Sequence, residues 1–146
     1  MNWDEYFLVL CEVIKLKSKD QNTKIGVVIV GKDHEVVSTG YNSFPRGIDD
    51  NVPARQERPE KYLWMEHAER NAIYNAARIG VSTKGCTMYM SCVMSCPDCA
   101  RAIINSGIIK IVVGNGDSAK GVQFSEESRN TVRQMFMEAG VEIVEL

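Results

Sequence analysis

Apolar side chains near the N-terminus recur every three or four positions, at Trp3, Phe7, Leu10, Cys11 and Ile14. This helical spacing predicts an amphipathic helix over residues 3–16. Residues 25–30 are rich in Val and Ile, which is typical of a buried strand. A turn sequence at 31–33 separates them from residues 35–41, so we predict that the two segments form a β-hairpin.

The middle of the chain begins with a long segment that has no apolar period. Residues 42–61 contain several prolines, and irregular loops of this length are usually functional or mobile. A helix is predicted to follow, running to about Arg78 and closed by Gly80. Further strands are predicted at 86–90, 108–113 and 141–144, and further helices at 97–105 and 125–139. The order αββαβαβαβ predicts an α/β protein, a three-layer α-β-α domain around a central mixed five-stranded sheet.

Composition narrows the choice of partners. The 146 residues fit one domain, 1–146, and the 17 basic and 19 acidic side chains leave a net charge of -2. This balance argues against a broad nucleic-acid surface but leaves room for one cationic phosphate pocket. The chain has no apolar run long enough for a bilayer and no signal-peptide pattern. Five cysteines without such a signal predict reduced thiols in the cytoplasm, with metal binding as an option.

Two short motifs carry candidate metal ligands. His67-Ala68-Glu69 and Cys96-Pro97-Asp98-Cys99 each lie where a helix is predicted to begin. The amide dipoles of a helix start favour thiolate, and two cysteines three positions apart can bind one ion. His67, Cys96 and Cys99 therefore form a candidate three-ligand zinc site, which leaves the fourth position for water.

A zinc site of this kind favours hydrolytic chemistry. Bound zinc lowers the pKa of its water toward neutrality, and deamination also needs a group that moves protons. Glu69, two residues from the histidine, is the candidate for that proton shuttle. The combination of His-x-Glu with Cys-x-x-Cys is the general signature of zinc deaminases. The alternative is a structural zinc site in which Cys92 supplies a fourth ligand.

Five segments of the chain carry a family resemblance. They are SKDQNTKIGVVIV, STGYNSFPRGIDD, EHAERNAIYNAAR, KGCTMYM and SCPDCARAIINSGIIKIVV. In this order they closely resemble the deoxycytidylate (dCMP) deaminases of the cytidine and deoxycytidylate deaminase superfamily. The resemblance spans roughly residues 17–145. It is more specific than the zinc motif, which cytidine, guanine and tRNA-adenosine deaminases share.

The resemblance implies a reaction and a set of roles. Members of this family are zinc-dependent hydrolases that convert dCMP to dUMP with release of ammonia and so feed thymidylate synthesis. Their zinc ligands fall on His67, Cys96 and Cys99, and their proton shuttle falls on Glu69. Their sugar-side asparagine falls on Asn42, and the backbone at Ala68 would face the base carbonyl. Many members are hexamers, activated by dCTP and inhibited by dTTP, so a homo-oligomer is expected.

This chain departs from the family pattern in three places. Ser95 replaces the usual proline before the first zinc cysteine, which adds a hydroxyl beside the site. Ser43 follows Asn42 where the family usually has glycine. Residues 114–121 replace a stretch that often carries an aromatic side chain near the nucleotide. Some members hold a second zinc ion in the long loop, but residues 42–66 contain no Cys or His, so we predict one Zn²⁺ per chain.

Other polar residues have weaker assignments. A phosphate requires positive charge, and Lys24, Arg46 and Arg78 are our candidates because each adjoins a segment shared with the family. Ser95 is a further candidate substrate contact. We expect His34 to be a solvated turn residue. Cys11 and Cys86 are expected in the core.

The sequence leaves three kinds of alternative open. One is a deaminase of free cytidine, of another cytosine nucleotide or of a 5-substituted dCMP. A tRNA adenosine deaminase shares the metal motif, but its polyanionic substrate predicts a basic excess that this chain lacks. The last is a catalytically silent nucleotide sensor or structural zinc domain, in which Glu69 would have no purpose.

Overall fold

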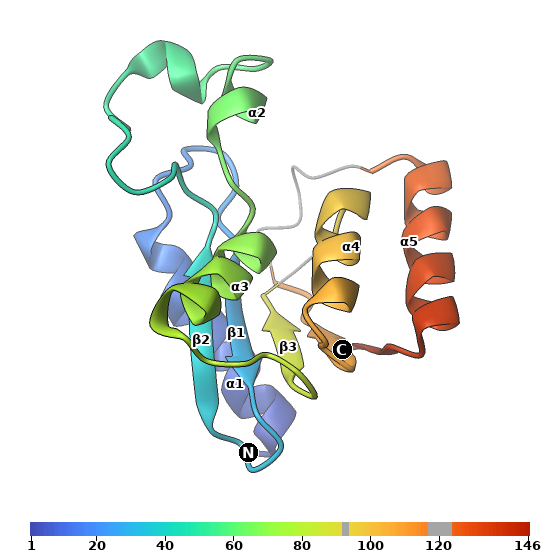
Figure 1. Ribbon diagram of the computed structural model, residues 1–146. Helices are drawn as coiled ribbons and strands as arrows, with labels where there is room; N and C mark the ends of the chain where they lie inside the picture. Colours follow the sequence, from blue (N-terminus) through green and yellow to red (C-terminus); the bar gives the residue numbers. More distant parts are fainter. Residues whose placement is uncertain (92–93, 117–123) are drawn as a thin grey trace.

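Five strands form one mixed sheet in the order β2-β1-β3-β4-β5. The first three of them, β2, β1 and β3, are labelled side by side in Figure 1. The computed structural model describes residues 1–91, 94–116 and 124–146. The strands are β1 Gly26–Val30, β2 Val36–Tyr41, β3 Thr87–Met90, β4 Lys110–Val113 and β5 Glu142–Glu145. β1 pairs antiparallel with both β2 and β3, whereas β4 and β5 continue the sheet in parallel. The predicted mixed five-stranded sheet and its N-terminal hairpin are confirmed.

Helices cover both faces of this sheet, which confirms the three-layer prediction (Figure 1). One face is covered by α1, Trp3–Ile14, and the other by α3, Ala68–Ile79, α4, Pro97–Asn105, and α5, Glu126–Ala139. Each face has its own apolar core, the larger one beneath α3, α4 and α5. The shorter elements are η1 Lys15–Lys17, η2 Pro53–Gln56 and α2 Lys61–Trp64. Among the described helices none is long and apolar enough to cross a membrane.

The strand directions place the starts of two helices at one end of the sheet. β2 and β3 each run antiparallel to β1, so they point the same way on either side of it. α4 follows β3 after a short connection, and α3 follows β2 after the long segment between residues 41 and 68. Because the helices that follow parallel strands begin at the same edge, the N-termini of α3 and α4 meet there.

Close packing of α3 against the β1–β2 hairpin fixes the position of the first turn of α3 relative to β2. Ala68, Ala72 and Ala76 are fully buried along the inner side of this helix. A Cβ at Gly40 of β2 would lie 2.5 Å from the carbonyl oxygen of Ala68, so glycine is required at this approach. Gly80 ends the helix in the left-handed conformation, φ 78°, as the sequence predicted.

Two asparagines of α3 also bind the exposed edge of β2. Asn71 Nδ2 donates to the carbonyl oxygen of Tyr41 at 2.8 Å, and Asn75 Nδ2 donates to that of Thr39 at 2.7 Å. Residues four apart on a helix thereby match residues two apart on a strand. These bonds use carbonyls that an edge strand would otherwise leave unpaired, and they hold α3 against the sheet.

The structure agrees with the predictions for three single residues of the fold. Cys11 and Cys86 are buried, as expected. His34 is exposed in the hairpin turn and stacks on Trp3, with 4.2 Å between the ring centroids. The first helix is shorter than predicted, because the chain tightens into η1 after Ile14. Cys92 lies outside the described residues, so its suggested role as a fourth ligand stays a prediction.

Candidate metal centre and adjoining cavity

The three candidate ligands lie at the first turns of α3 and α4. His67 has extended backbone angles and immediately precedes α3. Cys96 is the N-cap of α4, with Pro97 in the first helical turn, where a proline costs no hydrogen bond. The backbone N–H of Cys99 donates to the Cys96 sulfur at 3.4 Å, so the turn brings both sulfurs to one side.

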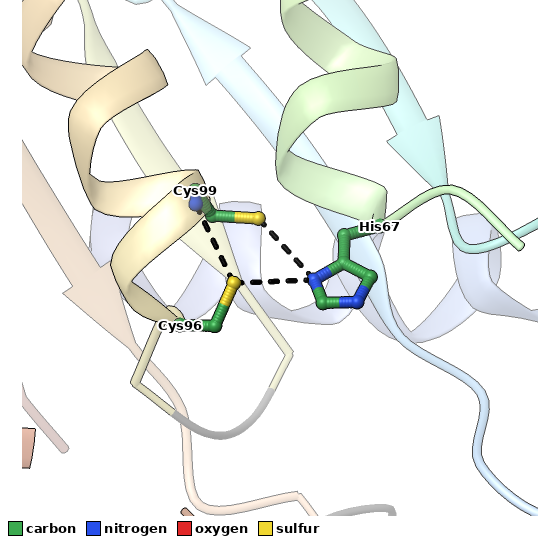
Figure 2. Close-up of side chains that lie close together, drawn as sticks. All are labelled: His67, Cys96 and Cys99. Carbon is green, nitrogen blue, oxygen red and sulfur yellow. Dashed lines mark hydrogen bonds between the residues drawn. The ribbon is translucent and has the colours of Figure 1, made fainter. Parts of the chain in front are cut away.

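The side chains of His67, Cys96 and Cys99 point toward one another (Figure 2). His67 Nδ1 lies 3.5 Å from Cys96 Sγ and 3.3 Å from Cys99 Sγ. Tetrahedral zinc, with bonds of about 2.0 Å to nitrogen and 2.3 Å to sulfur, would separate the nitrogen from each sulfur by about 3.5 Å. Within the described ranges this is the one group of three or more ligand-type side chains gathered closely enough to hold a metal. The residues fit one zinc ion, and their predicted convergence is confirmed.

The electrostatics of the three groups also suit a cation. The hydrogen bond with Cys99 lowers the pKa of the Cys96 thiol to about 4, against the opposing effect of burial. The same pair interaction, together with burial, raises the pKa of Cys99. The hydrogen bond with Cys96 raises the pKa of His67. One thiol therefore ionises within the pair, and a dication bound to both sulfurs would deprotonate the other.

Glu69 lies in the first turn of α3, directly beside the candidate ligands. Its carboxylate is buried, and Oε2 accepts a hydrogen bond from the Cys99 thiol at 3.7 Å. The hydroxyl of Ser95 donates to Oε1 at 3.2 Å. The carboxylate is thus held at the metal centre by groups on both of its oxygens. Its proton-shuttle role stays a prediction, but the position is the one that this role requires.

A cavity of about 750 Å³ opens onto Glu69 and the metal centre. This volume lies within the range of roughly 300–1,000 Å³ that is usual for small-molecule sites. The lining residues come from the 20–25 loop, the end of β2, α2 and the starts of α3 and α4. They are Asp20, Thr23, Ile25, Asn42, Arg58, Lys61, Tyr62, Met65, His67, Ala68, Glu69, Arg70, Met94, Cys96, Asp98 and Phe124.

Asn42 lines this cavity and also organises its wall. Its Oδ1 accepts from the backbone N–H of Ile25 at 2.8 Å, and its Nδ2 donates to the carbonyl oxygen of Thr23 at 2.7 Å and to Asp20. The side chain therefore keeps one acceptor lone pair for a ligand. Asp20 in turn accepts from Lys61 of α2 at 2.7 Å, in an ion pair with both side chains buried. This chain of contacts joins α2 to the loop before β1.

The cationic residues of the cavity differ from those predicted for the phosphate. Arg58, Lys61 and Arg70 line it, whereas Lys24, Arg46 and Arg78 do not. Lys24 and Arg78 are exposed elsewhere, and Arg46 donates to Oδ1 of Asn75, a residue of α3 outside the cavity lining. Within one chain the phosphate assignment of these three residues has no structural support.

Of the two further candidate substrate contacts, Ala68 lines the cavity and Ser95 does not. Ala68 lines the cavity, and its N–H belongs to the first turn of a helix, where such groups have no intrahelical acceptor. Ser95 is buried behind Glu69 and is absent from the cavity lining. The structure therefore associates Ser95 with the carboxylate rather than with a ligand.

Several cavity residues had no local signal in the sequence. Asp20 and Thr23 belong to a segment shared with the family, but nothing in that segment indicated their use. Lys61 and Arg58 lie in the 42–61 segment, which has no apolar period that could indicate their use. Only packing of that stretch against the 20–25 loop brings them to the cavity.

The fold and the three-ligand centre match a known class of zinc-binding deaminases. The family model described as "Cytidine and deoxycytidylate deaminase zinc-binding region" matches residues 1–115. The chain belongs to the cytidine and deoxycytidylate deaminase family.

Two curated relatives are deoxycytidylate deaminases of mammals. The chain is 33% identical to that of Mus musculus over 146 residues, which cover 97% of this chain and 78% of the relative. It is 35% identical to that of Homo sapiens over 117 residues, covering 77% of this chain. The chain spans only 64% of the length of that human relative.

A solved structure shares the whole fold. The dCMP deaminase of cyanophage S-TIM5 in its apo form gives a TM-score of 0.75 at 22% identity, covering 98% of this chain and 96% of the phage protein. The same phage enzyme has been solved in complex with dCMP and dUMP, with a TM-score of 0.74 at 21% identity and coverage of 97% and 95%. This likeness establishes the arrangement of helices and strands.

Proposed function

We propose that the protein catalyses the hydrolytic deamination of dCMP to dUMP, releasing ammonia and supplying dUMP for thymidylate synthesis. The observation that carries this proposal is the buried carboxylate of Glu69, held beside a His-Cys-Cys centre at the base of a nucleotide-sized cavity. The deoxycytidylate deaminase relatives and the dCMP and dUMP complex of the phage enzyme support the choice of substrate.

The reaction replaces the C4–N bond of cytosine with a C4–O bond and uses one water molecule. A zinc ion held by His67, Cys96 and Cys99 would supply the Lewis acidity that activates water near neutral pH. Glu69 accepts a proton from this water and delivers it to the ring nitrogen N3. It then transfers the proton of the new C4 hydroxyl to the amino group, so that the C4–N bond breaks and ammonia leaves.

Other residues of the chain orient the nucleotide. The free N–H of Ala68 in the first turn of α3 suits the base carbonyl, as the family resemblance implies. Asn42 presents its remaining lone pair at the sugar side of the cavity. Lys24, Arg46 and Arg78 remain phosphate candidates only if another subunit or a substrate-bound arrangement brings them to the site.

Assembly and regulation follow from the resemblance and form part of the proposal. We propose a homo-oligomer, a hexamer, in which dCTP activates and dTTP inhibits. The outer side of α1 exposes large apolar side chains, including Trp3, Val9 and Val13, which association of subunits would cover. Light scattering after size-exclusion chromatography, with and without each triphosphate, tests the subunit number and its response.

We propose that the protein is cytoplasmic and forms a single domain, each on the basis of one structural feature. The candidate centre needs two reduced thiols, which a cytoplasmic environment maintains. The described strands of residues 1–146 form one sheet, which supports a single zinc-dependent deaminase domain. Cell fractionation tests the location, and limited proteolysis of the folded chain tests the domain.

An ammonia-release screen tests the proposed activity. The purified chain is assayed with dCMP, dCDP, dCTP, deoxycytidine, a 5-substituted dCMP and a tRNA anticodon stem. Turnover is expected to be fastest with dCMP. Faster turnover of deoxycytidine or of a 5-substituted dCMP would assign a different cytosine substrate, and turnover of the tRNA alone would assign adenosine deamination. No release from any substrate, with zinc bound, would identify a silent nucleotide-binding or structural zinc domain.

A further inference from the structure

We propose that Arg58 and the hydroxyl of Thr23 bind the 5′-phosphate of the substrate and so select a nucleotide over a nucleoside. Both residues line the cavity that His67, Glu69 and Cys96 also line. The inference rests on the proposed deamination of a cytosine nucleotide. It differs from the sequence-based phosphate candidates, none of which lines this cavity in the chain.

Charge pairing separates Arg58 from the other two cations of the cavity. Lys61 Nζ is 2.7 Å from Asp20, so its charge is already matched by a buried carboxylate. Arg70 lies 2.6 Å from Glu66 and 3.8 Å from Asp98. In the parts of the chain that the structure describes, Arg58 has no acidic partner. Among the three cations of this cavity, Arg58 is therefore the one available to form an ion pair with an anionic ligand.

The Thr23 hydroxyl is a second polar group that needs a partner. Thr23 is only 7% exposed, and its Oγ1 has no hydrogen-bond partner among the described residues. Its backbone is nevertheless fixed at both ends, because the N–H donates to Asp20 at 3.0 Å and the carbonyl accepts from Asn42 at 2.7 Å. A buried hydroxyl without a partner is costly, and a bound phosphate oxygen would accept its hydrogen bond.

The chemistry of the two groups suits a phosphate monoester. A guanidinium presents parallel N–H donors that match two phosphate oxygens, and a hydroxyl adds a third donor. The Arg58 guanidinium also lies 5.8 Å from the centre of the Tyr62 ring, which helps to orient it. Thr23 and Arg58 border a neighbouring cavity as well, but His67, Glu69 and Cys96 do not line that one, so a nucleotide whose base reaches Glu69 occupies the first cavity.

Steady-state kinetics with paired substrates tests the assignment. Arg58→Ala is expected to lower kcat/KM for dCMP by ~10- to 100-fold, the effect of losing a charge-assisted contact, and to leave that for deoxycytidine within about threefold. Thr23→Val should act in the same direction with a smaller effect. Arg55→Ala is the matched control, because Arg55 lies in the same segment but stacks on Trp64 outside the cavity lining.

Arg55→Ala should change kcat/KM for dCMP and for deoxycytidine by the same factor. Equal losses for dCMP and deoxycytidine in Arg58→Ala would show that Arg58 supports the loop rather than the phosphate. Unchanged dCMP kinetics would also overturn the proposal. Thermal unfolding of each variant establishes that it is folded before kinetics are compared.

A binding measurement separates this inference from the proposed activity. Calorimetric titration of the Glu69→Gln variant with dCMP and with deoxycytidine reports recognition without turnover. Adding Arg58→Ala should raise the Kd for dCMP and leave that for deoxycytidine unchanged. If the wild-type chain fails to deaminate dCMP, the proposed function fails, and this Kd ratio still decides the role of Arg58. A ratio unaltered by Arg58→Ala would refute the phosphate contact.

Discussion

The hydroxyl of Ser95 donates a hydrogen bond of 3.2 Å to Oε1 of Glu69, and both side chains are buried. Ser95 also lies directly before the first candidate zinc cysteine, at a position where the resembled family usually has proline. In this chain the extra hydroxyl contacts the carboxylate that is proposed to move protons. Ser95 is therefore a positioning residue for Glu69.

Replacing Ser95 should change turnover more than substrate binding. Ser95→Ala is expected to lower kcat for dCMP by ~3- to 10-fold with little change in KM, because one neutral hydrogen bond to the carboxylate is lost. Ser95→Thr keeps the hydroxyl and should recover most of the rate. Ser38→Ala removes another buried serine hydroxyl, one that bonds the Ala72 carbonyl, and serves as control. A wild-type kcat in Ser95→Ala would contradict the positioning role.

Glu69→Gln should separate metal binding from turnover. The amide keeps the size of the side chain but cannot carry protons, so kcat is expected to fall by at least ~100-fold. Zinc content should stay at one ion per chain, measured by inductively coupled plasma mass spectrometry on the same sample. Retained activity would exclude Glu69 as the proton shuttle. Loss of zinc together with activity would instead make it a structural part of the metal centre.

Removing a ligand sulfur should abolish zinc retention. Cys99→Ser replaces a thiolate with a much poorer zinc ligand, and the purified variant is expected to contain far less than one zinc per chain. Cys86→Ser is the control, because Cys86 is buried in the core away from the candidate centre. Chelation of the wild-type protein should likewise remove activity and lower its thermal midpoint. Full zinc occupancy in Cys99→Ser would require a different ligand set.

Lys61→Met tests the buried ion pair that joins α2 to the loop before β1. Lys61 and Asp20 lie 2.7 Å apart with both side chains buried, so the change leaves a buried carboxylate without its partner. The free energy of unfolding should fall by about 3–5 kcal/mol. Lys19→Met breaks an exposed pair with Asp50 and should cost at most about 1 kcal/mol. Urea unfolding measures the free energy of unfolding of the two variants. Equal losses would mean that another group compensates the charge of Asp20 when Lys61 is replaced.

Gly40→Ala tests the close approach of α3 to β2. The added methyl group would lie within 2.5 Å of backbone atoms of Ala68 and Ala72, which cannot move without shifting the helix. We expect a loss of about 1–3 kcal/mol in unfolding free energy and weaker zinc binding, since the helix start carries His67. In Gly31→Ala the methyl group meets only the flexible Glu35 side chain, so that variant should be nearly neutral. Comparable destabilisation of the two variants would argue against the packing explanation.

The elements of the fold and the convergence of the candidate metal ligands could be predicted because their signals are local. Apolar spacing, turn residues and caps act within a few positions, and they indicated all five strands and the main helices. His67, Cys96 and Cys99 were recognisable because each motif stands at a helix start, where capping and spacing fix the direction of the ligands.

The rest of the site depends on which distant segments pack together. The ion pair of Lys61 with Asp20 and the pairing of Asn71 with the Tyr41 carbonyl have no local pattern, because each joins residues about 30 or 40 positions apart. Nothing local in the sequence distinguishes Arg58 from Arg46; in the folded chain Arg58 lines the cavity, whereas Arg46 binds Asn75. The sequence by itself determined the sheet, the helices and the candidate zinc ligands, whereas the tertiary structure decided which side chains line the cavity, because that depends on contacts across the whole chain.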